Sequence, residues 1–127
     1  MNFAIDLDAF HSKYGFHDTP LTPSNLSFRI DLLEEELAEL KEAVSTKNSE
    51  EIVDALIDLI YIAVGTLDLA EINIPQAWAA VHDANMKKVR GIKPGREQSG
   101  GFDVLKPEGW VAPSHKGNHG CLPTILA

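Results

Sequence analysis

The chain has 127 residues, a length that fits one domain with a substantial core. Its formal net charge of -8 and pI near 5.0 argue against nucleic acid or an anionic membrane as the main partner, because both attract Lys and Arg surfaces. Cys121 is the single cysteine, so an internal disulfide is excluded. Asp6 and Asp8 stand where a signal peptide would need a basic start and an apolar run. We therefore expect a cytoplasmic protein.

Two helices are predicted at the start of the chain, over residues 3–14 and from Ser24 or Ser27 to about residue 44. The second has an apolar residue at every third or fourth position, as is typical of a helix in a bundle. These positions are Leu26, Ile30, Leu33, Leu37, Leu40 and Val44. At about 100° per residue, Glu36 falls at the border of this stripe and Glu39 lies beside it.

A third helix is predicted over residues 50–70, with Ser49 as its N-cap. Apolar residues cover almost its whole circumference, which predicts a helix surrounded by others. Three aspartates, among them Asp68, argue against a membrane span, since each costs about 2.5 to 3.5 kcal/mol near a bilayer centre. One narrow acidic line remains. Glu51, Asp54 and Asp58 are spaced at i, i+3 and i+7 and project from one face.

A fourth helix is predicted from Asn73, its N-cap, to about residue 89, with Pro75 in the first turn. One side of it carries Trp78, Val81, Asn85 and Lys88. After residue 91 the many glycines and prolines predict irregular structure. We therefore predict an all-α fold, with a helical catalytic domain over residues 1–90 and a tail over residues 91–127 that packs on or links subunits.

The acidic residues on the second and third helices call for cations, because carboxylates are rarely buried without a partner. Two like charges about 4 Å apart repel by about 4 kcal/mol at an effective dielectric of 20. Mg²⁺ and Mn²⁺ favour oxygen ligands. The sequence contains no partnered Glu-x-x-His motif of the kind that di-iron carboxylate bundles use. We therefore predict a site for a hard divalent metal ion.

Several of these side chains have a structural alternative. Asp54 and Asp58 would also suit an ion pair or a buried hydrogen bond, although few basic residues are near in sequence. Glu35, like its neighbours Glu34 and Glu42, would suit a solvated helix face. Lys88, together with Arg90, would suit the negative end of the fourth helix.

The aromatic and histidine side chains outside the acidic line are expected to have structural roles. The aromatic residues predicted for the core are Phe10, Phe16, Tyr61 and Trp78. We expect His11 and His17 at the surface or in an interface. The tail residues His115, His119 and Cys121 resemble zinc ligands but lack a fourth partner, so they are left unassigned.

The acidic motifs carry a family resemblance. Glu35-Glu36-x-x-Glu39, followed by Glu51-x-x-Asp54, resembles the paired motif of the MazG-like, all-α nucleoside triphosphate pyrophosphohydrolases. The surrounding matches are Arg29, Asp54-Ala-Leu-Ile-Asp58-Leu-Ile-Tyr61, Gly65-Thr66 and Val81-His82-x-x-Asn85-Met86-x-Lys88. A later segment, Lys106-Pro107-Glu108-Gly109-Trp110, is similar to a tail of short, phage-type members. The resemblance covers about residues 10–110.

The resemblance implies a helical bundle completed by a second subunit, with dimers commonly pairing into tetramers. It also implies cleavage between the α- and β-phosphates, which yields a nucleoside monophosphate and pyrophosphate. By the same resemblance Glu36, Glu39, Glu51 and Asp54 hold Mg²⁺ or Mn²⁺. Asp58, one turn beyond Asp54, is assigned to the same metal set as a ligand or as the support of one.

The resemblance further assigns Glu35 to the position of the general base in some members. Lys88 is expected to pair with a phosphate oxygen and Asn85 to donate a hydrogen bond to phosphate or sugar. Relatives of this architecture include enzymes that act on phosphoribosyl-ATP in histidine synthesis. The short chain and the segment ending at Trp110 resemble the phage-type enzymes more than those, which favours an enzyme active in the host cytoplasm. MazZ-type relatives act on dGTP and GTP, which is the narrower prediction for this chain.

Two alternatives of other classes stay open for this chain. One is a house-cleaning enzyme for dUTP, dCTP or damaged nucleotides. The other is a non-catalytic helical interaction module, in which the acidic line holds ions for structure alone.

Overall fold

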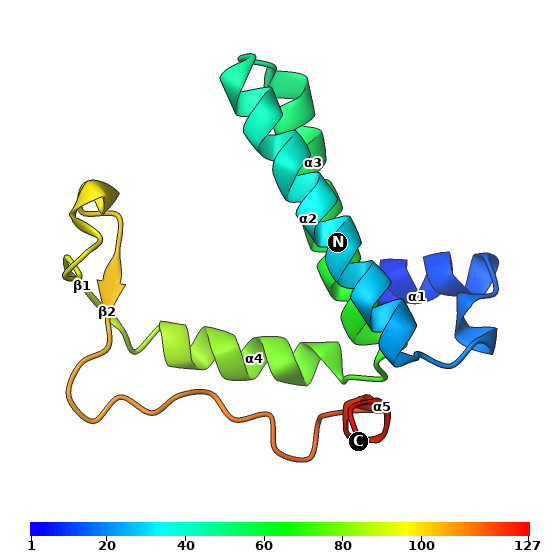
Figure 1. The fold of residues 1–127 in the computed structure, drawn as a ribbon. Helices are drawn as coiled ribbons and strands as arrows, with labels where there is room; N and C mark the ends of the chain where they lie inside the picture. The colour runs from blue at the N-terminus through cyan, green and yellow to red at the C-terminus, as the bar shows by residue number, and fades with distance from the viewer. The chain divides into compact units, whose positions relative to one another are not determined.

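The computed structural model describes residues 1–127 and is mainly helical (Figure 1). Its longer helices are α1 (Phe3–Lys13), α2 (Pro23–Ser45), α3 (Ser49–Leu69) and α4 (Ile74–Asn85). Shorter elements are the 3₁₀-helices η1 (Phe16–Asp18) and η2 (Glu97–Ser99), the strands β1 (Val89–Arg90) and β2 (Val104–Leu105), and the helix α5 (Leu122–Ile125). The predicted all-α class is confirmed.

The chain forms two compact units, one of Met1–Ile74 with Asn118–Ala127 and the other of Pro75–Gly117. In the first unit α2 and α3 form a helical hairpin, and α1 packs against α3 (Figure 1). The second unit contains nearly all of α4 and the antiparallel pair of β1 and β2. The predicted catalytic domain over residues 1–90 stays a prediction.

Side-chain N-caps define the first residues of the two long helices, α2 and α3. The hydroxyl of Thr22 accepts a hydrogen bond from the Asn25 N–H, so α2 begins just before the predicted serines. The side chain of Asn48 accepts from the Glu51 N–H and caps α3. The prediction of Ser49 as this cap is therefore wrong, since an amide one residue earlier does the same task.

Gly65 lets α1 and α2 approach α3 closely. A Cβ at this position would lie 2.7 Å from the guanidinium of Arg29 and 3.2 Å from Leu7. Arg29 uses this space to donate from Nε to the Thr66 hydroxyl at 3.0 Å and from its terminal nitrogen to the Ile62 carbonyl at 2.9 Å. These bonds fix α2 against α3 near the buried Leu7.

Within the single chain, α3 is not surrounded by other helices as predicted. Val53 and Ile57 are 62% and 53% exposed, because α1 and α2 cover only part of the circumference of this helix. The aromatic prediction is also wrong in part, since Phe16 is exposed and Trp78 is 70% exposed. The exposed large apolar residues of the hairpin are Phe28, Ile30, Leu37, Val44, Val53, Leu56, Ile57, Ile60 and Leu67.

The C-terminal segment packs back on the end of α3 within the first unit. The Asn118 amide donates to the Asn73 carbonyl at 2.9 Å and accepts from the Asn73 N–H at 2.8 Å. The Cys121 N–H donates to the Ala70 carbonyl at 2.9 Å. Gly120 has φ 53°, and a Cβ there would clash with the Ala70 carbonyl oxygen at 1.8 Å. This part of the tail is therefore ordered by specific bonds.

In the second unit, the fourth helix ends earlier than predicted. α4 ends at Asn85 and not near residue 89, because Val89 and Arg90 pair with β2 as an extended strand. Lys88 therefore lies outside the helix. The indole N–H of Trp110 donates to the Ala84 carbonyl at 2.8 Å and satisfies one of the last carbonyls of α4. No helix of the chain combines the length and apolar character that a membrane crossing requires.

Candidate metal site

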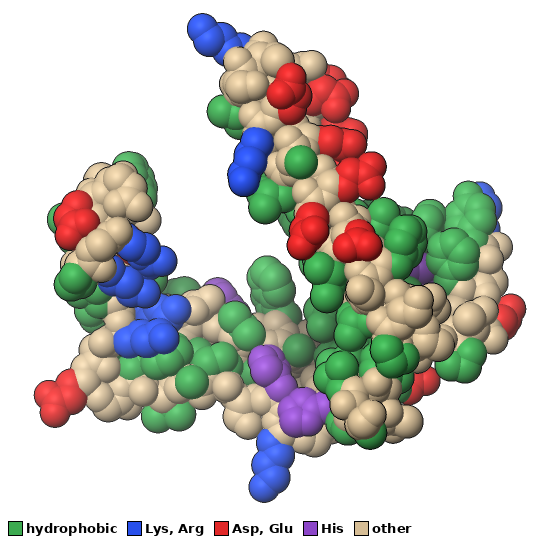
Figure 2. Space-filling view, in the orientation of Figure 1, with side chains coloured by type: hydrophobic (Ala, Val, Ile, Leu, Met, Phe, Trp, Pro, Cys, Tyr) green, Lys and Arg blue, Asp and Glu red, His purple; other side chains and the backbone are tan.

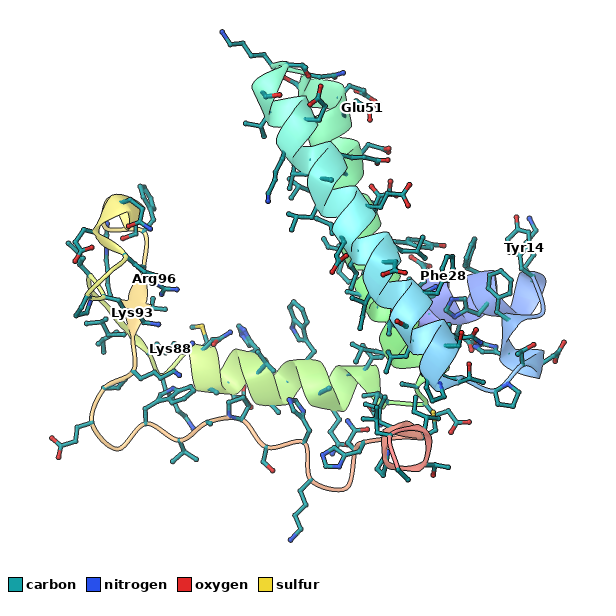
Figure 3. The ribbon with its side chains drawn as sticks, in the orientation of Figure 1. Tyr14, Phe28, Glu51, Lys88, Lys93 and Arg96 are labelled. Atoms are coloured by element: carbon teal, nitrogen blue, oxygen red, sulfur yellow. The ribbon has the colours of Figure 1, made fainter.

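The α2–α3 hairpin carries the five acidic residues of the paired motifs and Asp58. Figure 2 shows acidic side chains along this hairpin, and Figure 3 shows Glu51 near the end where the two helices join. The residues on α2 are Glu35, Glu36 and Glu39, and those on α3 are Glu51, Asp54 and Asp58. The short turn between the helices, from Thr46 to Asn48, brings the two motifs to the same end of the hairpin.

Glu36 is the most perturbed carboxyl of this set. It is half-buried, and its Oε2 atom is buried without a hydrogen-bond partner. Burial, a hydrogen bond with Glu39 and the charges of Glu39, Asp58 and Glu35 raise the pKa of Glu36 to about 7. An unpartnered buried carboxylate oxygen is costly, so this atom is suited to a cation.

Asp58 belongs to the same electrostatic cluster. Burial raises its pKa, and the charges of Asp54 and Glu39 raise it further. The structure therefore brings Glu36 and Glu39 of α2 near Asp54 and Asp58 of α3.

Glu51 is linked to this cluster through Glu39. The two side chains line a cavity of about 340 Å³ at the end of the hairpin. Its other lining residues are Glu42, Ala43, Thr46 and Asn48. Glu51 is exposed, and its place near the other carboxylates is shown by the cavity that it shares with Glu39.

The chemistry of the cluster fits a hard divalent cation. The four ion pairs of the chain involve other residues, so no Lys, Arg or His forms an ion pair with a carboxylate of the cluster. The ion-pair alternative for Asp54 and Asp58 is therefore not what the structure shows. Only oxygen ligands are present, as Mg²⁺ and Mn²⁺ prefer. The cluster is open, because no three of its carboxylates have ligand oxygens within 4.8 Å of one another.

Glu35 is exposed on α2, directly before Glu36. Its charge contributes to the raised pKa of Glu36, so the two carboxylates lie close enough to interact electrostatically. The structure gives it no hydrogen-bond partner that would hold it as part of a structural network. Its role as a base stays a prediction.

Asn85 and Lys88 belong to the second unit. Asn85 is the last residue of α4, and its carbonyl accepts from the Lys88 N–H at 3.1 Å. The Lys88 ammonium lies 5.3 Å from the centre of the Trp110 ring, and that of Lys106 lies 5.1 Å from it. Figure 3 shows Lys88, Lys93 and Arg96 around this part of the second unit. Trp110 thus holds two ammonium groups near the end of α4.

Sequence reasoning missed a second polar cluster in the first unit. His11 is only 1% exposed, so its prediction as a surface or interface residue is wrong. Its Nδ1 lies 2.6 Å from Oδ2 of Asp68, and Nε2 of His17 lies 2.7 Å from the same oxygen. One sequence signal was available, since His11 follows the apolar Leu7 at i+4 and so shares its buried helix face.

Comparison with known proteins places the chain in a family. Residues 9–85 match the family described as phosphoribosyl-ATP pyrophosphohydrolase, PRA-PH. A segment of 52 residues is 38% identical to part of an uncharacterized protein of Acanthamoeba polyphaga mimivirus. That similarity covers 41% of this chain and 21% of the mimivirus protein, so it spans about a fifth of that relative.

The family match includes all of α2 and α3 and therefore every carboxylate of the acidic cluster. It ends at Asn85, the last residue of α4. Membership supports a nucleotide pyrophosphohydrolase activity in general terms, and it confirms the resemblance carried by the paired acidic motifs. The chain belongs to the PRA-PH family of the MazG-like, all-α nucleoside triphosphate pyrophosphohydrolases.

Proposed function

We propose that the protein is a metal-dependent nucleoside triphosphate pyrophosphohydrolase that cleaves between the α- and β-phosphates. The observation that carries this proposal is the buried, unpartnered Oε2 of Glu36 inside a cluster of carboxylates from two helices. A stable protein keeps such a cluster only with compensation for the repulsion. The family membership supplies the type of reaction.

Glu36, Glu39, Glu51 and Asp54 are the proposed ligands of Mg²⁺ or Mn²⁺, and Asp58 either binds a metal ion or supports a ligand. When bound, such ions neutralise phosphate charge and stabilise the leaving pyrophosphate. The raised pKa of Glu36 means that it must lose its proton before it serves as a full ligand near neutral pH. The α2–α3 hairpin keeps these residues on a rigid pair of helices.

Three further residues have proposed roles toward substrate. Glu35 accepts the proton of the attacking water, which suits an exposed carboxylate beside a metal ligand. Lys88 pairs with a phosphate oxygen and Asn85 donates a hydrogen bond to phosphate or sugar. A ring contact does not use up the hydrogen-bond donors of an ammonium group, so the contact of Lys88 with Trp110 is compatible with phosphate binding.

The proposed substrates are dGTP and GTP. Support comes from the segment between Lys106 and Trp110, which is similar to that of phage-type members. In this structure the segment is anchored to α4 by the bond from Trp110 to Ala84. A base-selective site would contain polar groups that are left unpaired by the wrong base, so the preference should appear as a difference in kcat/KM.

The proposal includes assembly of the chain into a dimer or tetramer. On α3 the exposed apolar residues Val53, Ile57, Ile60 and Leu67 follow helical spacing and form one line. Monomeric proteins rarely expose large continuous apolar surfaces. A second copy of the hairpin is the proposed cover.

A panel of ribo- and deoxynucleoside triphosphates, incubated with Mg²⁺ or Mn²⁺, tests the function. The expected products are a nucleoside monophosphate and pyrophosphate, with the highest kcat/KM for dGTP or GTP. Preference for dUTP, dCTP or a damaged nucleotide would indicate the house-cleaning alternative. Diphosphate plus orthophosphate would contradict the proposed cleavage site. Absence of turnover with every nucleotide would favour the non-catalytic module.

A further inference from the structure

The first unit holds a second group of metal-ligating side chains, distinct from the acidic cluster in both position and chemistry. His11 of α1, His17 of η1 and Asp68 of α3 each contribute one ligand atom, and both imidazole nitrogens contact the same Asp68 oxygen. These three atoms all lie within 4.8 Å of one another. No other group of three or more His, Cys, Asp or Glu side chains in the chain meets that condition.

We propose that His11, His17 and Asp68 form a binding site for a zinc-type divalent transition metal ion. The ligand atoms are Nδ1 of His11, Nε2 of His17 and Oδ2 of Asp68. Two imidazoles and one carboxylate are a common donor set for zinc, whereas Mg²⁺ prefers oxygen ligands alone. The proposal does not depend on the activity proposed for the acidic cluster.

The ligand atoms lie at hydrogen-bond distances, which are somewhat shorter than a bound zinc ion requires. Zinc binds nitrogen and oxygen at about 2.0–2.2 Å, so the ligand atoms of a tetrahedral site lie roughly 3.3–3.5 Å apart. The two imidazole nitrogens lie 2.6 and 2.7 Å from the Asp68 oxygen. An outward shift of less than about 1 Å would therefore open the group for the ion.

The surroundings hold the imidazole rings in place. His11 lies beside Phe10 and Phe16, with ring centres 5.7 and 5.8 Å away. Nδ1 of His17 lies 3.3 Å from the Ser12 hydroxyl, which provides the outer hydrogen bond that metal-binding histidines normally have. The ligands thus come from three elements that are already packed together.

His11 is almost completely buried, and its two ring nitrogens have different surroundings. Nδ1, the proposed ligand atom, lies 2.6 Å from the Asp68 carboxylate, whereas Nε2 is buried without a hydrogen-bond partner. Burial and the contact with Asp68 therefore hold the ring with Nδ1 toward the group.

The group also has access to solvent and to further ligands. His17 and Asp68 line a cavity of about 520 Å³, together with Asp8 and Cys121. The Asp8 carboxylate lies 3.8 Å from Nε2 of His17 and is a candidate for an additional ligand. An ion can therefore enter from this cavity and complete its coordination with Asp8 or water.

Zinc titration of the purified full chain tests the proposal. Excess Mg²⁺ is present throughout, and bound zinc is measured by elemental mass spectrometry after gel filtration, with Tm followed in parallel. The expected result is one zinc ion per chain and a higher Tm. The same stoichiometry should persist in the double variant Glu36→Gln with Asp54→Asn. No zinc binding, or its loss in this double variant, would overturn the proposal.

Variants of the ligands provide the second part of the test. His17→Gln and Asp68→Asn should weaken zinc binding by at least about tenfold. His17 is 32% exposed, so its variant is expected to fold and decides the matter if Asp68→Asn does not. The matched control is His119→Gln, an exposed histidine of the same unit outside the group. Equal zinc affinity for His17→Gln and the unchanged protein would show that these residues form a hydrogen-bonded group only.

Discussion

Arg29 of α2 donates from Nε to the Thr66 hydroxyl of α3 across 3.0 Å, and this bond joins the two helices that carry the acidic motifs. A second nitrogen of Arg29 donates to the Ile62 carbonyl one turn earlier. Because two directions of the guanidinium are used, the bonds set both the distance and the register between the helices. The carboxylates of α2 and α3 are brought opposite one another as a consequence.

Arg29→Ala is therefore expected to lower the free energy of unfolding by about 2 kcal/mol, since two hydrogen bonds from a charged donor are lost. Arg29→Lys should recover only part of the lost stability, because an ammonium cannot reproduce the fork of the guanidinium. Urea unfolding measures the free energy of unfolding of both variants. The control is Lys41→Ala at an exposed position of the same helix. Equal stability of Arg29→Ala and this control would show that the bonds do not fix the hairpin.

Glu36→Gln is expected to reduce metal-dependent turnover on the order of 100-fold, a loss comparable to that of one key stabilising group in an active site. The variant should remain folded, because the amide relieves repulsion from Glu39 and Asp58. Asp54→Asn should act in the same direction. Release of pyrophosphate and circular dichroism measure the two effects. Glu34→Gln, an exposed neighbour, serves as control, and normal turnover in Glu36→Gln would remove the metal-site assignment.

Glu35→Gln separates the proposed base from the ligands. Turnover should fall at least about tenfold while Mg²⁺ affinity stays nearly unchanged, because general-base catalysis contributes roughly 10² to 10⁴ in rate. Steady-state kinetics and calorimetric metal titration give the two quantities. A parallel loss of metal affinity and turnover would identify Glu35 as a ligand instead. Unchanged kinetics would show that Glu35 is a solvated surface residue with no part in catalysis.

The raised pKa of Glu36 predicts a pH dependence in metal-free protein. Its pKa is about 7 in the folded state against an ordinary value of 4.5, so the folded state binds more protons between these pH values. The free energy of unfolding contributed by this group therefore falls as pH rises from about 4.5 to 7 and stays low above.

Thermal unfolding of metal-free protein across this pH range measures the effect. Glu36→Gln should show a shallower decrease of Tm, because its side chain does not titrate. Mg²⁺ should bind more weakly below pH 7, since the proton of Glu36 then competes with the cation. An identical pH dependence of Tm in the variant and the unchanged protein would contradict the assignment to Glu36.

The exposed apolar line of α3 predicts an oligomer that a single charge can disrupt. Ile57→Glu should shift the protein toward monomers, because burial of an unpaired carboxylate in an apolar interface is costly. Size-exclusion chromatography with light scattering measures the mass. Val111→Glu, an exposed apolar position in the second unit, is the matched control. A monomeric unchanged protein, or an intact oligomer of Ile57→Glu, would refute the proposed interface.

Local physical rules were enough to predict the helices and the acidic line, because both follow from the periodicity of a helix. The apolar residues between Leu26 and Val44 recur at helical spacing, and this pattern does not depend on what packs against the helix. Glu51, Asp54 and Asp58 must share a face once α3 forms. The end of α4 was missed because the pairing of Val89 with Leu105 decides it, and a strand partner that far along the chain leaves no periodic signal.

Tertiary packing alone decided the environment of each polar group. Asp68 and His11 are 57 residues apart in sequence, and they meet where α1 packs against α3 beside Gly65, which has no side chain to hold the helices apart. Burial and the charges gathered from two helices raise the pKa of Glu36, whereas Glu35 beside it is exposed. Spacing along one helix says which residues share a face, but solvation depends on what the rest of the chain places against that face.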